Sequence, residues 1–468
     1  MNGLIREVIT LQNNNLTNST KNHKWRSQFH LEPDKGWMND PNGLCFFGGK
    51  YHVFFQYAPE TPDGSGLKSW GHFIGKSLAD WSFAGEALIP DNPDDKDGVY
   101  SGSAVVSDGL MHIFYTGNVK ENGDHDFIKS GRGANVIHVT SADGKCFSEK
   151  KTALRNMDYP DFVSCHVRDP KVWRDEKSGC WKMVLGARTL SDKGCVLIYK
   201  SSDLDNWSFE KSISTSEVFG YMWECPDIFE LDGKTFLSVS PQGLEHFDTK
   251  YQNLFQSGYF PLDEKYEPGC FTEWDSGFDF YAPQTFLAPD GRRILIGWMG
   301  IGDNSYTNAT TAFGWQHCLT VPREITLKNN KLYQNPASEI TSLRTRGMNI
   351  SDGTVCEITL PFDMEAITSD SFCISLGNDL RLCYSKAAGL FNMEFSNGFG
   401  KGRTRRTAEL KTCNSIRILC DTSSSEVYLN GGELVMSTRF YPDENKLLLT
   451  ASGIDGFLYP MKAMEVKF

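Results

Sequence analysis

Five segments of the sequence share a turn glycine followed by a β-rich run. The segments begin at Gly49, Gly109, Gly179, Gly233 and Gly291, so the glycines lie 60, 70, 54 and 58 residues apart. A short apolar run precedes each of them, and each unit is therefore predicted to open with a β-hairpin. Self-similarity at such a period is typical of a β-propeller in which each unit is one four-stranded blade.

A second repeated element falls between these segments. Residues 77–83, 141–147 and 202–209 each begin with serine, end with phenylalanine and carry aspartate between them, and their starts are spaced by 64 and 61 residues. Two elements that repeat with the same period favour a five-bladed propeller over residues 23–325. A large irregular β-sandwich is the alternative reading of the same strands.

The pattern changes after residues 322–324, where short alternating strands replace the long repeats. A hairpin is predicted over residues 426–435, because Asn430 and Gly431 supply the positive-φ turn. We therefore predict a linker over residues 326–350 and a β-sandwich over residues 351–468. Residues 1–22, which are largely polar from Asn13 to Asn22, are predicted to form a flexible tail. The predicted fold is all-β, a five-bladed β-propeller followed by a C-terminal β-sandwich.

Composition excludes several classes of function. The net charge of −12 argues against nucleic acid as a partner, and no apolar window is long enough to span a membrane. The N-terminus lacks the pattern of a secretory signal, so a cytoplasmic monomer or homodimer is expected. The 13 cysteines include no C-x-x-C pair and are expected to be reduced. Histidines are scattered, so no metal and no cofactor are predicted.

Three carboxylates precede the turn glycines at nearly the same distance. Asp40 lies nine residues before its glycine, Asp169 ten and Glu224 nine. The first strands of propeller blades surround the axis, so these side chains are predicted to meet at one mouth of the central channel. Two carboxylates are the minimum equipment for hydrolysing a glycosidic bond.

The local motifs around these carboxylates resemble glycoside hydrolase family 32, the invertases, fructan hydrolases and bacterial sucrose-6-phosphate hydrolases. The family's W-M-N-D-P-N-G block stands at residues 37–43, its R-D-P block at 168–170 and its E-C pair at 224–225. The resemblance extends from about His23 to the end of the chain. It implies the same propeller and sandwich that the repeats indicate.

The resemblance also implies a mechanism and a set of contacts. Asp40 would be the nucleophile, Glu224 the general acid and base, and Asp169 a stabiliser of the transition state. Partial burial beside Trp223 would raise the pKa of Glu224. The remaining candidates for substrate binding are Trp37, Asn39, Gln56, Trp70, Ser101, Arg168, Tyr281 and Trp298.

The expected substrate is sucrose or its 6-phosphate, because residues 240–245, 251–253 and 256–260 look like the sucrose-6-phosphate hydrolase branch. Basic residues on the leaving-group side would favour a phosphate, and Arg188 is one candidate. A hydrolase of fructans or short fructo-oligosaccharides is an alternative. An inverting propeller glycosidase and a non-catalytic carbohydrate-binding propeller are further alternatives from other classes.

Overall fold

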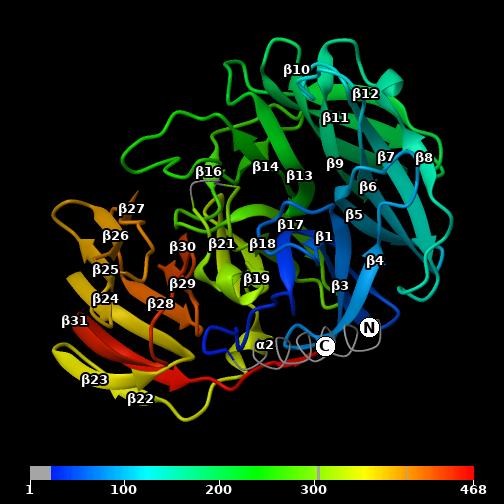
Figure 1. Cartoon of the computed structure of the whole chain (residues 1–468). Coiled ribbons are helices and arrows are strands. Elements are labelled where there is room, and N and C mark those ends of the chain that lie inside the picture. The colour runs from blue at the N-terminus through cyan, green and yellow to red at the C-terminus, as the bar shows by residue number, and fades with distance from the viewer. Residues whose placement is uncertain (1–22, 303–305, 397) are drawn as a thin grey trace, which may run out of the picture.

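The computed structural model describes residues 23–302, 306–396 and 398–468, so the tail predicted over residues 1–22 lies outside the described residues. The described residues form six β-sheets (Figure 1). The helices among these described residues are the short η1 (Asn156–Asp158), η2 (Ala309–Phe313) and α2 (Ser338–Thr341). The prediction of an all-β chain is confirmed.

The sheets that precede the C-terminal region make up a β-propeller (Figure 1). The first contains β1 (Gly36–Phe47), β2 (Lys50–Ala58), β3 (Ser69–Ser77) and β4 (Asp80–Leu88), extended by β19 (Trp315–Gln316) and β32 (Glu465–Lys467). The second contains β5 (Val99–Ser107), β6 (Leu110–Lys120), β7 (Arg132–Ser141) and β8 (Lys151–Leu154). The third contains β9 (Val163–Asp175), β10 (Cys180–Thr189), β11 (Gly194–Ser201) and β12 (Ser208–Ile213).

The last two propeller sheets complete the series. The fourth contains β13 (Met222–Leu231), β14 (Lys234–Gln242), β15 (Gly258–Leu262) and β16 (Thr272–Glu273). The fifth contains β17 (Tyr281–Leu287), β18 (Arg293–Trp298), β20 (Arg323–Lys328) and β21 (Lys331–Pro336). β21 and part of β20 come from residues for which the sequence predicts a linker.

The repeated glycines lie at the turn of the first hairpin of each sheet. Their φ angles are +74° at Gly49, +76° at Gly109, +66° at Gly179, +75° at Gly233 and +87° at Gly291. Residues with a side chain rarely adopt this left-handed backbone, which explains why glycine recurs at the turn. The predicted hairpins are confirmed, since the strands on either side of each glycine are paired.

The second repeat forms the turn between the third and fourth strands of its sheet. In two copies a tryptophan closes this turn, with Trp81 Nε1 donating to the Leu78 carbonyl at 3.2 Å and Trp207 Nε1 donating to the Leu204 carbonyl at 3.1 Å. In the third copy Asp143 Oδ1 accepts two backbone N–H groups of the turn, at 2.8 Å each. These local hydrogen bonds explain the serine, aspartate and aromatic pattern.

The first strands of the hairpins contact one another in the order β1, β5, β9, β13 and β17, and β17 contacts β1. Side chains from strands far apart in the sequence can therefore meet at the axis. Four of the propeller sheets have the expected four strands, whereas the sheet of β1 is enlarged to six by β19 and β32. The propeller is thus established, while the count of five equivalent blades stays a prediction.

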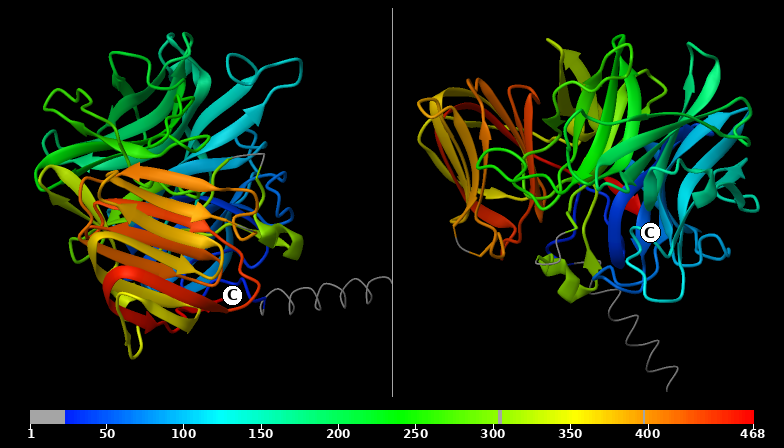
Figure 2. Two further views of the ribbon diagram at one scale, coloured as in Figure 1. Left: turned by 90° about the vertical axis from the view of Figure 1, so that its left-hand side faces the viewer. Right: turned by 90° about the horizontal axis from the view of Figure 1, so that it is seen from above.

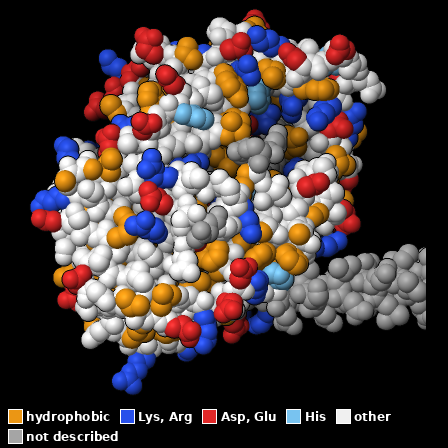
Figure 3. Space-filling model, turned by 60° about the vertical axis from the view of Figure 1, so that its left-hand side comes forward, with side chains coloured by type: hydrophobic (Ala, Val, Ile, Leu, Met, Phe, Trp, Pro, Cys, Tyr) orange, Lys and Arg blue, Asp and Glu red, His pale blue; other side chains and the backbone are white. Residues whose placement is uncertain are grey.

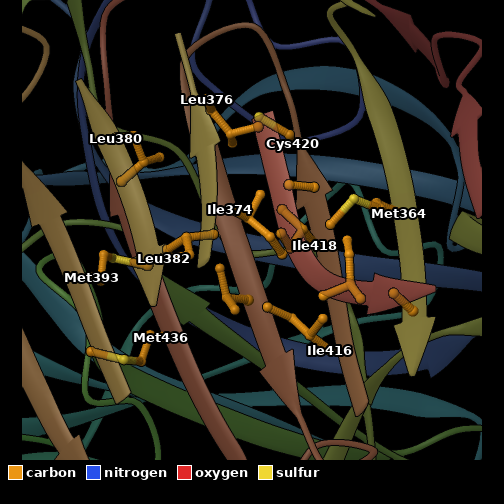
Figure 4. Packing of buried hydrophobic residues seen from close by; sticks show 14 of the residues in the cluster. Met364, Ile374, Leu376, Leu380, Leu382, Met393, Ile416, Ile418, Cys420 and Met436 are labelled. Carbon is orange, nitrogen blue, oxygen red and sulfur yellow. The ribbon is translucent and has the colours of Figure 1, made fainter. Parts of the chain in front are cut away.

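The C-terminal region forms one sandwich-like sheet of ten strands. These are β22 (Met348–Ile350), β23 (Thr354–Thr359), β24 (Phe362–Leu376), β25 (Leu380–Ser385), β26 (Leu390–Phe395), β27 (Arg405–Glu409), β28 (Ser415–Cys420), β29 (Ser424–Leu429), β30 (Leu434–Arg439) and β31 (Lys446–Pro460). β24 and β31 are long enough to pair along both layers, as β24 joins β28 with one half and β25 with the other. Figure 2 shows this sheet beside the propeller, and Figure 4 shows the buried aliphatic and methionine side chains between its layers.

The predicted hairpin of this region is also present. Asn430, with a φ of +51°, and Gly431, with a φ of +67°, lie between the paired strands β29 and β30. The last strand, β32, leaves the sandwich and pairs in parallel with β4 of the propeller. The two parts of the molecule are therefore joined by backbone pairing as well as by side chains.

Buried charges hold the propeller against the sandwich. Arg323 Nη2 lies 2.6 Å from Glu426 Oε2 and 3.2 Å from Asp275 Oδ2, with all three side chains fully buried. His30 bridges two sandwich carboxylates, with Nδ1 at 2.8 Å from Asp421 and Nε2 at 2.9 Å from Glu426. Because an unpaired buried charge is costly, these pairs favour one relative position of the two parts.

The cysteines depart from the expectation that all are reduced. Cys373 of β24 and Cys383 of β25 form a disulfide. They occupy directly opposed positions of the two strands, with Cα atoms 4.1 Å apart. The spacing of the cysteines in the sequence does not predict this pairing. Cys45 and Cys420 are free and buried as expected.

The surface carries both signs of charge. On the face shown in Figure 3, acidic and basic side chains are interspersed, and hydrophobic side chains appear in small groups. Within the described residues, no helix is long and apolar enough to cross a membrane.

Candidate active site

Every first hairpin of the propeller sheets is interrupted by a bulge near the axis. The regular pairing stops and resumes between Met38 and Pro41, Val99 and Gly102, Arg168 and Lys171, Glu224 and Asp227, and Tyr281 and Gln284. In four of the five strands the bulge contains or ends at a proline, which cannot donate a ladder hydrogen bond. A bulge redirects the adjoining side chains, and here it turns polar side chains toward the axis.

The three predicted carboxylates occupy neighbouring positions around this bulge. Glu224 is the last paired residue before it, Asp169 is the first unpaired residue and Asp40 the second. Relative to the bulge, Asp169 is therefore one residue and Asp40 two residues further along than Glu224, although all three lie at nearly the same distance from the turn glycine. For Asp40 the difference involves a second irregularity of β1, between Asn42 and Cys45, which the distance to the glycine does not show.

Asp40 is held by donors from three strands. Ser101 Oγ donates to its Oδ2 at 2.6 Å, and Asn39 Nδ2 donates to its Oδ1 at 3.1 Å. The Cys225 thiol donates to the same Oδ2 at 3.6 Å. Burial raises the pKa of Asp40, while these three donors favour its ionised form. The carboxylate is therefore oriented and supplied with the hydrogen bonds that a nucleophilic anion needs.

Glu224 has one oxygen in hydrogen bonds and one facing Arg168 and His166. Its Oε2 accepts from Gln242 Nε2 at 2.8 Å and from the Tyr281 hydroxyl at 2.9 Å. Its Oε1 lies 3.6 Å from Arg168 Nη1 and 3.9 Å from His166 Nε2. Burial raises the pKa of Glu224 against the opposing effects of Arg168 and Tyr281, and the Asp40 charge raises it further. A raised pKa suits a carboxyl group that must donate a proton.

Asp169 is hydrogen-bonded to Cys225, whose thiol also contacts Asp40. Asp169 and Cys225 have left-handed backbones, with φ of +61° and +48°, and the Cys225 N–H donates to Asp169 Oδ2 at 2.9 Å. Burial raises the pKa of Asp169 to about 7, with Glu224 and Asp40 adding to the rise and Arg168 opposing it. The Cys225 thiol therefore lies between two carboxylates, and burial and these charges raise its pKa.

These groups face a cavity of about 260 Å³ at the axis. Of the predicted site residues, Asn39, Asp40, Gln56, Ser101, Arg168, Asp169, Glu224, Tyr281 and Trp298 line it. Trp37 lies beside the lining, where its Nε1 donates to Asn39 Oδ1 at 2.8 Å and its ring lies 5.9 Å from that of Trp298. The predicted convergence at one end of the channel is therefore observed.

Two predicted tryptophans lie behind the cavity wall. Trp70 is fully buried in the core, and its Nε1 donates to the Tyr100 carbonyl at 3.0 Å. Trp223 is also fully buried and packs between sheets, because alternation along β13 turns it away from the side on which Glu224 lies. The side chains in hydrogen-bond contact with Glu224 are Tyr281 and Gln242.

The structure adds cavity residues that sequence reasoning missed. These are Lys68, Tyr100, Gln242, Phe255 and Gly302. Tyr100 immediately precedes Ser101, and Gln242 lies in the segment 240–245 that suggested the substrate branch, so both had a local signal. Lys68 and Phe255 had none, because loops between strands bring them to the axis.

Metal chemistry has no side-chain cluster to support it in the part of the chain that the structure describes. No group of three or more histidine, cysteine, aspartate or glutamate side chains there is arranged to hold a metal ion.

Comparison with known proteins agrees with this geometry. The model of the glycosyl hydrolases family 32 N-terminal domain matches residues 30–336, and that of the family 32 C terminal matches residues 324–456. The chain belongs to glycosyl hydrolase family 32. It is similar to the sucrose-6-phosphate hydrolase of Bacillus subtilis, with 38% identity over 450 residues that cover 92% of this chain and 91% of the relative.

Solved structures show the same architecture. The sucrose-6-phosphate hydrolase of Lactobacillus gasseri superposes with a TM-score of 0.87 at 26% identity, over 96% of both chains. The GH32 β-fructofuranosidase of Bombyx mori, in a sucrose complex, superposes with a TM-score of 0.83 at 29% identity. That match covers 97% of this chain and 98% of the other.

Proposed function

We propose that this glycoside hydrolase releases fructose from sucrose-6-phosphate or sucrose with retention of configuration. One observation carries the proposal: Asp40, Asp169 and Glu224, from three different propeller sheets, face one cavity with different hydrogen-bond partners. A retaining hydrolase needs one carboxylate as nucleophile and a second group as acid and then base. The name of the Bacillus subtilis relative supports the choice of substrate.

In the proposed mechanism Asp40 attacks the anomeric carbon of the fructosyl unit as Glu224 protonates the departing glycosidic oxygen. The resulting ester between Asp40 and fructose is cleaved by water, from which Glu224 now accepts a proton. Two inversions at the same carbon produce net retention, and they require carboxyl groups about 5–5.5 Å apart. The donors to Asp40 and Glu224 suit these separate roles.

Asp169 is proposed to bind fructose hydroxyls and to stabilise the positive charge that develops in the transition state. Interactions that strengthen as charge develops raise kcat more than they lower KM. Asn39, Gln56 and Ser101 are proposed to complete the fructosyl pocket with Trp298 as its ring wall, because all four line the cavity beside Asp40. Trp37 and Trp70 are proposed to act by supporting Asn39 and the Tyr100–Ser101 bulge.

We further propose that the propeller has five blades, the enlarged sheet of β1 being one of them. The closed order of contacts from β1 through β17 supports this count. The pairing of β20 with β21 supports a propeller that extends to about residue 336, where the first family match also ends. The cytoplasmic location and the choice between monomer and homodimer stay predictions from the sequence.

The proposal is tested by measuring glucose or glucose-6-phosphate release from sucrose, sucrose-6-phosphate and a short inulin side by side. The expected result is a higher kcat/KM on sucrose-6-phosphate or sucrose than on inulin, and the opposite order would favour the fructan hydrolase alternative. Asp40→Ala and Glu224→Ala should each remove most activity without unfolding the chain. If the wild-type chain released nothing, a non-catalytic sugar-binding propeller would be the better account.

A further inference from the structure

Three arginines gather around His166 on the Glu224 side of the cavity. Arg168 lies two residues from His166 on β9, so the two side chains share one face of the strand. Arg188 lies on the paired strand β10, where the preceding Ala187 is opposite Val167. Arg132 begins β7 of the neighbouring sheet. We call Arg132, Arg168 and Arg188 the arginine cluster.

The charges of all three arginines act on His166. Burial lowers its pKa to about 2, and Arg168, Arg132 and Arg188 each contribute to the lowering. The Arg168 guanidinium also lowers the pKa of Arg132. The three guanidinium groups repel one another, so anions nearby are needed to offset this repulsion.

The anions are fewer than the cations. Arg168 faces Glu224, at 3.6 Å, and its charge also interacts with that of Asp169. Arg188 Nε donates to Asp192 at 2.9 Å. Asp192 is shared with Lys129, whose Nζ lies 3.3 Å away. Within the described residues, Arg132 has no carboxylate within 4 Å. Its guanidinium donates to neutral oxygens of Phe127 and Asn118, at 2.8 and 2.6 Å, and it also interacts with Tyr100.

Two buried donors or acceptors of this cluster also lack a hydrogen-bond partner. They are His166 Nδ1, on a side chain that is 9% exposed, and Arg168 Nε. Buried polar atoms are nearly always paired in folded proteins, so unpaired ones mark a place where a ligand or water binds. The net positive charge indicates that the ligand group is an anion.

The proposed mechanism tells which part of the substrate lies there, and the inference rests on that proposed function. The general acid stands next to the leaving group, because it protonates the oxygen that departs. Glu224 lies 3.6 Å from Arg168 of the arginine cluster, whereas the fructosyl residues Asn39, Gln56 and Ser101 lie beside Asp40. The cluster is therefore on the leaving-group side.

We propose that Arg132 and Arg188 bind the phosphate on the glucosyl unit of sucrose-6-phosphate and so determine the preference over sucrose. A guanidinium suits this task because its fork of N–H groups matches two phosphate oxygens. Lys68 is the alternative cation of the cavity. It lies over the Trp37 ring at 5.2 Å and donates to the Gly64 carbonyl at 2.6 Å, which places it on the nucleophile side.

The test compares kcat/KM on sucrose-6-phosphate and on sucrose in Arg132→Gln and Arg188→Gln. Losing a charge-assisted contact should lower the ratio of the two values about 10- to 100-fold, mainly through KM for the phosphate ester. Arg132→Lys keeps the charge but loses the fork, so its ratio should fall less. Inorganic phosphate should inhibit the wild-type enzyme competitively, and it should inhibit Arg132→Gln less.

Arg174→Gln is the matched control, because Arg174 lies on the same strand as Arg168 but packs over the Trp181 ring at the other end of the sheet. It should change neither kcat/KM value. The inference would be overturned if the ratio of the two kcat/KM values were unchanged in Arg132→Gln, Arg132→Lys and Arg188→Gln, or if it fell only in Lys68→Met. If the wild type still hydrolyses sucrose, such a result contradicts the phosphate site and leaves the proposed function intact.

Discussion

The hydrogen bond from Tyr281 to Glu224 leads to a specific pH prediction. The phenol donates to Oε2 at 2.9 Å and thereby stabilises the ionised carboxylate, so it holds the pKa of Glu224 down against the effect of burial. Tyr281→Phe removes this donor, and the pKa of Glu224 should rise. A hydrogen bond to a charged group is worth about 1.5–3 kcal/mol, and 1.36 kcal/mol corresponds to about one pKa unit.

Gln242 Nε2 still donates to the same oxygen at 2.8 Å, so we expect the lower end of that range, a rise of about 1 unit. The assay is glucose release from sucrose between pH 4 and about pH 9. The basic limb of kcat/KM reports loss of the acid proton in the free enzyme, and it should move to higher pH by about 1 unit.

Tyr266→Phe serves as the control, since Tyr266 lies against Lys211 at 3.6 Å and outside the cavity of the carboxylates. Its pH profile should match that of the wild type. A basic limb that stays in place or moves to lower pH in Tyr281→Phe would refute the reasoning, because the phenol would then not stabilise the ionised form.

Three further predictions concern the transition state and the interface. Asp169→Asn should lower kcat about 10²–10³-fold with a much smaller change in KM, which steady-state kinetics on sucrose would measure. Arg323→Met leaves Glu426 and Asp275 buried without their partner, so the free energy of unfolding in denaturant should fall by about 3–5 kcal/mol. The control is Arg405→Met, which removes the more exposed ion pair with Glu394, and its free energy of unfolding should fall by less than about 1 kcal/mol. Burial disfavours the charged form of His30, but the hydrogen bonds that its ring donates to Asp421 and Glu426 prevail and raise its pKa to about 9. The stabilisation is therefore full below about pH 6.5 and is lost as the pH rises through 9, and His30→Gln should flatten the dependence of unfolding on pH in that range.

Local sequence was enough for the hairpins and the catalytic motifs. The turn glycines recur because each occupies a positive-φ position between paired strands, and Asn430-Gly431 forms its hairpin turn for the same reason. Prolines 41, 170, 226 and 283 follow or occupy the bulges near the axis, so the motifs around Asp40, Asp169 and Glu224 also specify the local backbone. These features depend on residues a few positions apart, which is why the sequence alone predicts them.

The contacts that give each carboxylate its own environment could not be read in that way. Tyr281 and Gln242 reach the same oxygen of Glu224 from positions 57 and 18 residues away, and Ser101 reaches Asp40 across 61 residues. Trp70 was predicted as a binding residue and Trp223 as a residue beside Glu224. Their fully buried positions likewise depend on how neighbouring sheets pack.

The all-β class, the repeat, the order of the motifs and the identity of the three carboxylates could be predicted from the sequence alone. The donors that hold each carboxylate could be identified only in the folded structure. The same is true of the contacts of His30 with Asp421 and Glu426, nearly 400 residues away, and of the pairing of Cys373 with Cys383. The physical reason is that turns and bulges follow from local backbone preferences, whereas burial, pKa shifts and ion pairs depend on distances between strands that packing alone sets.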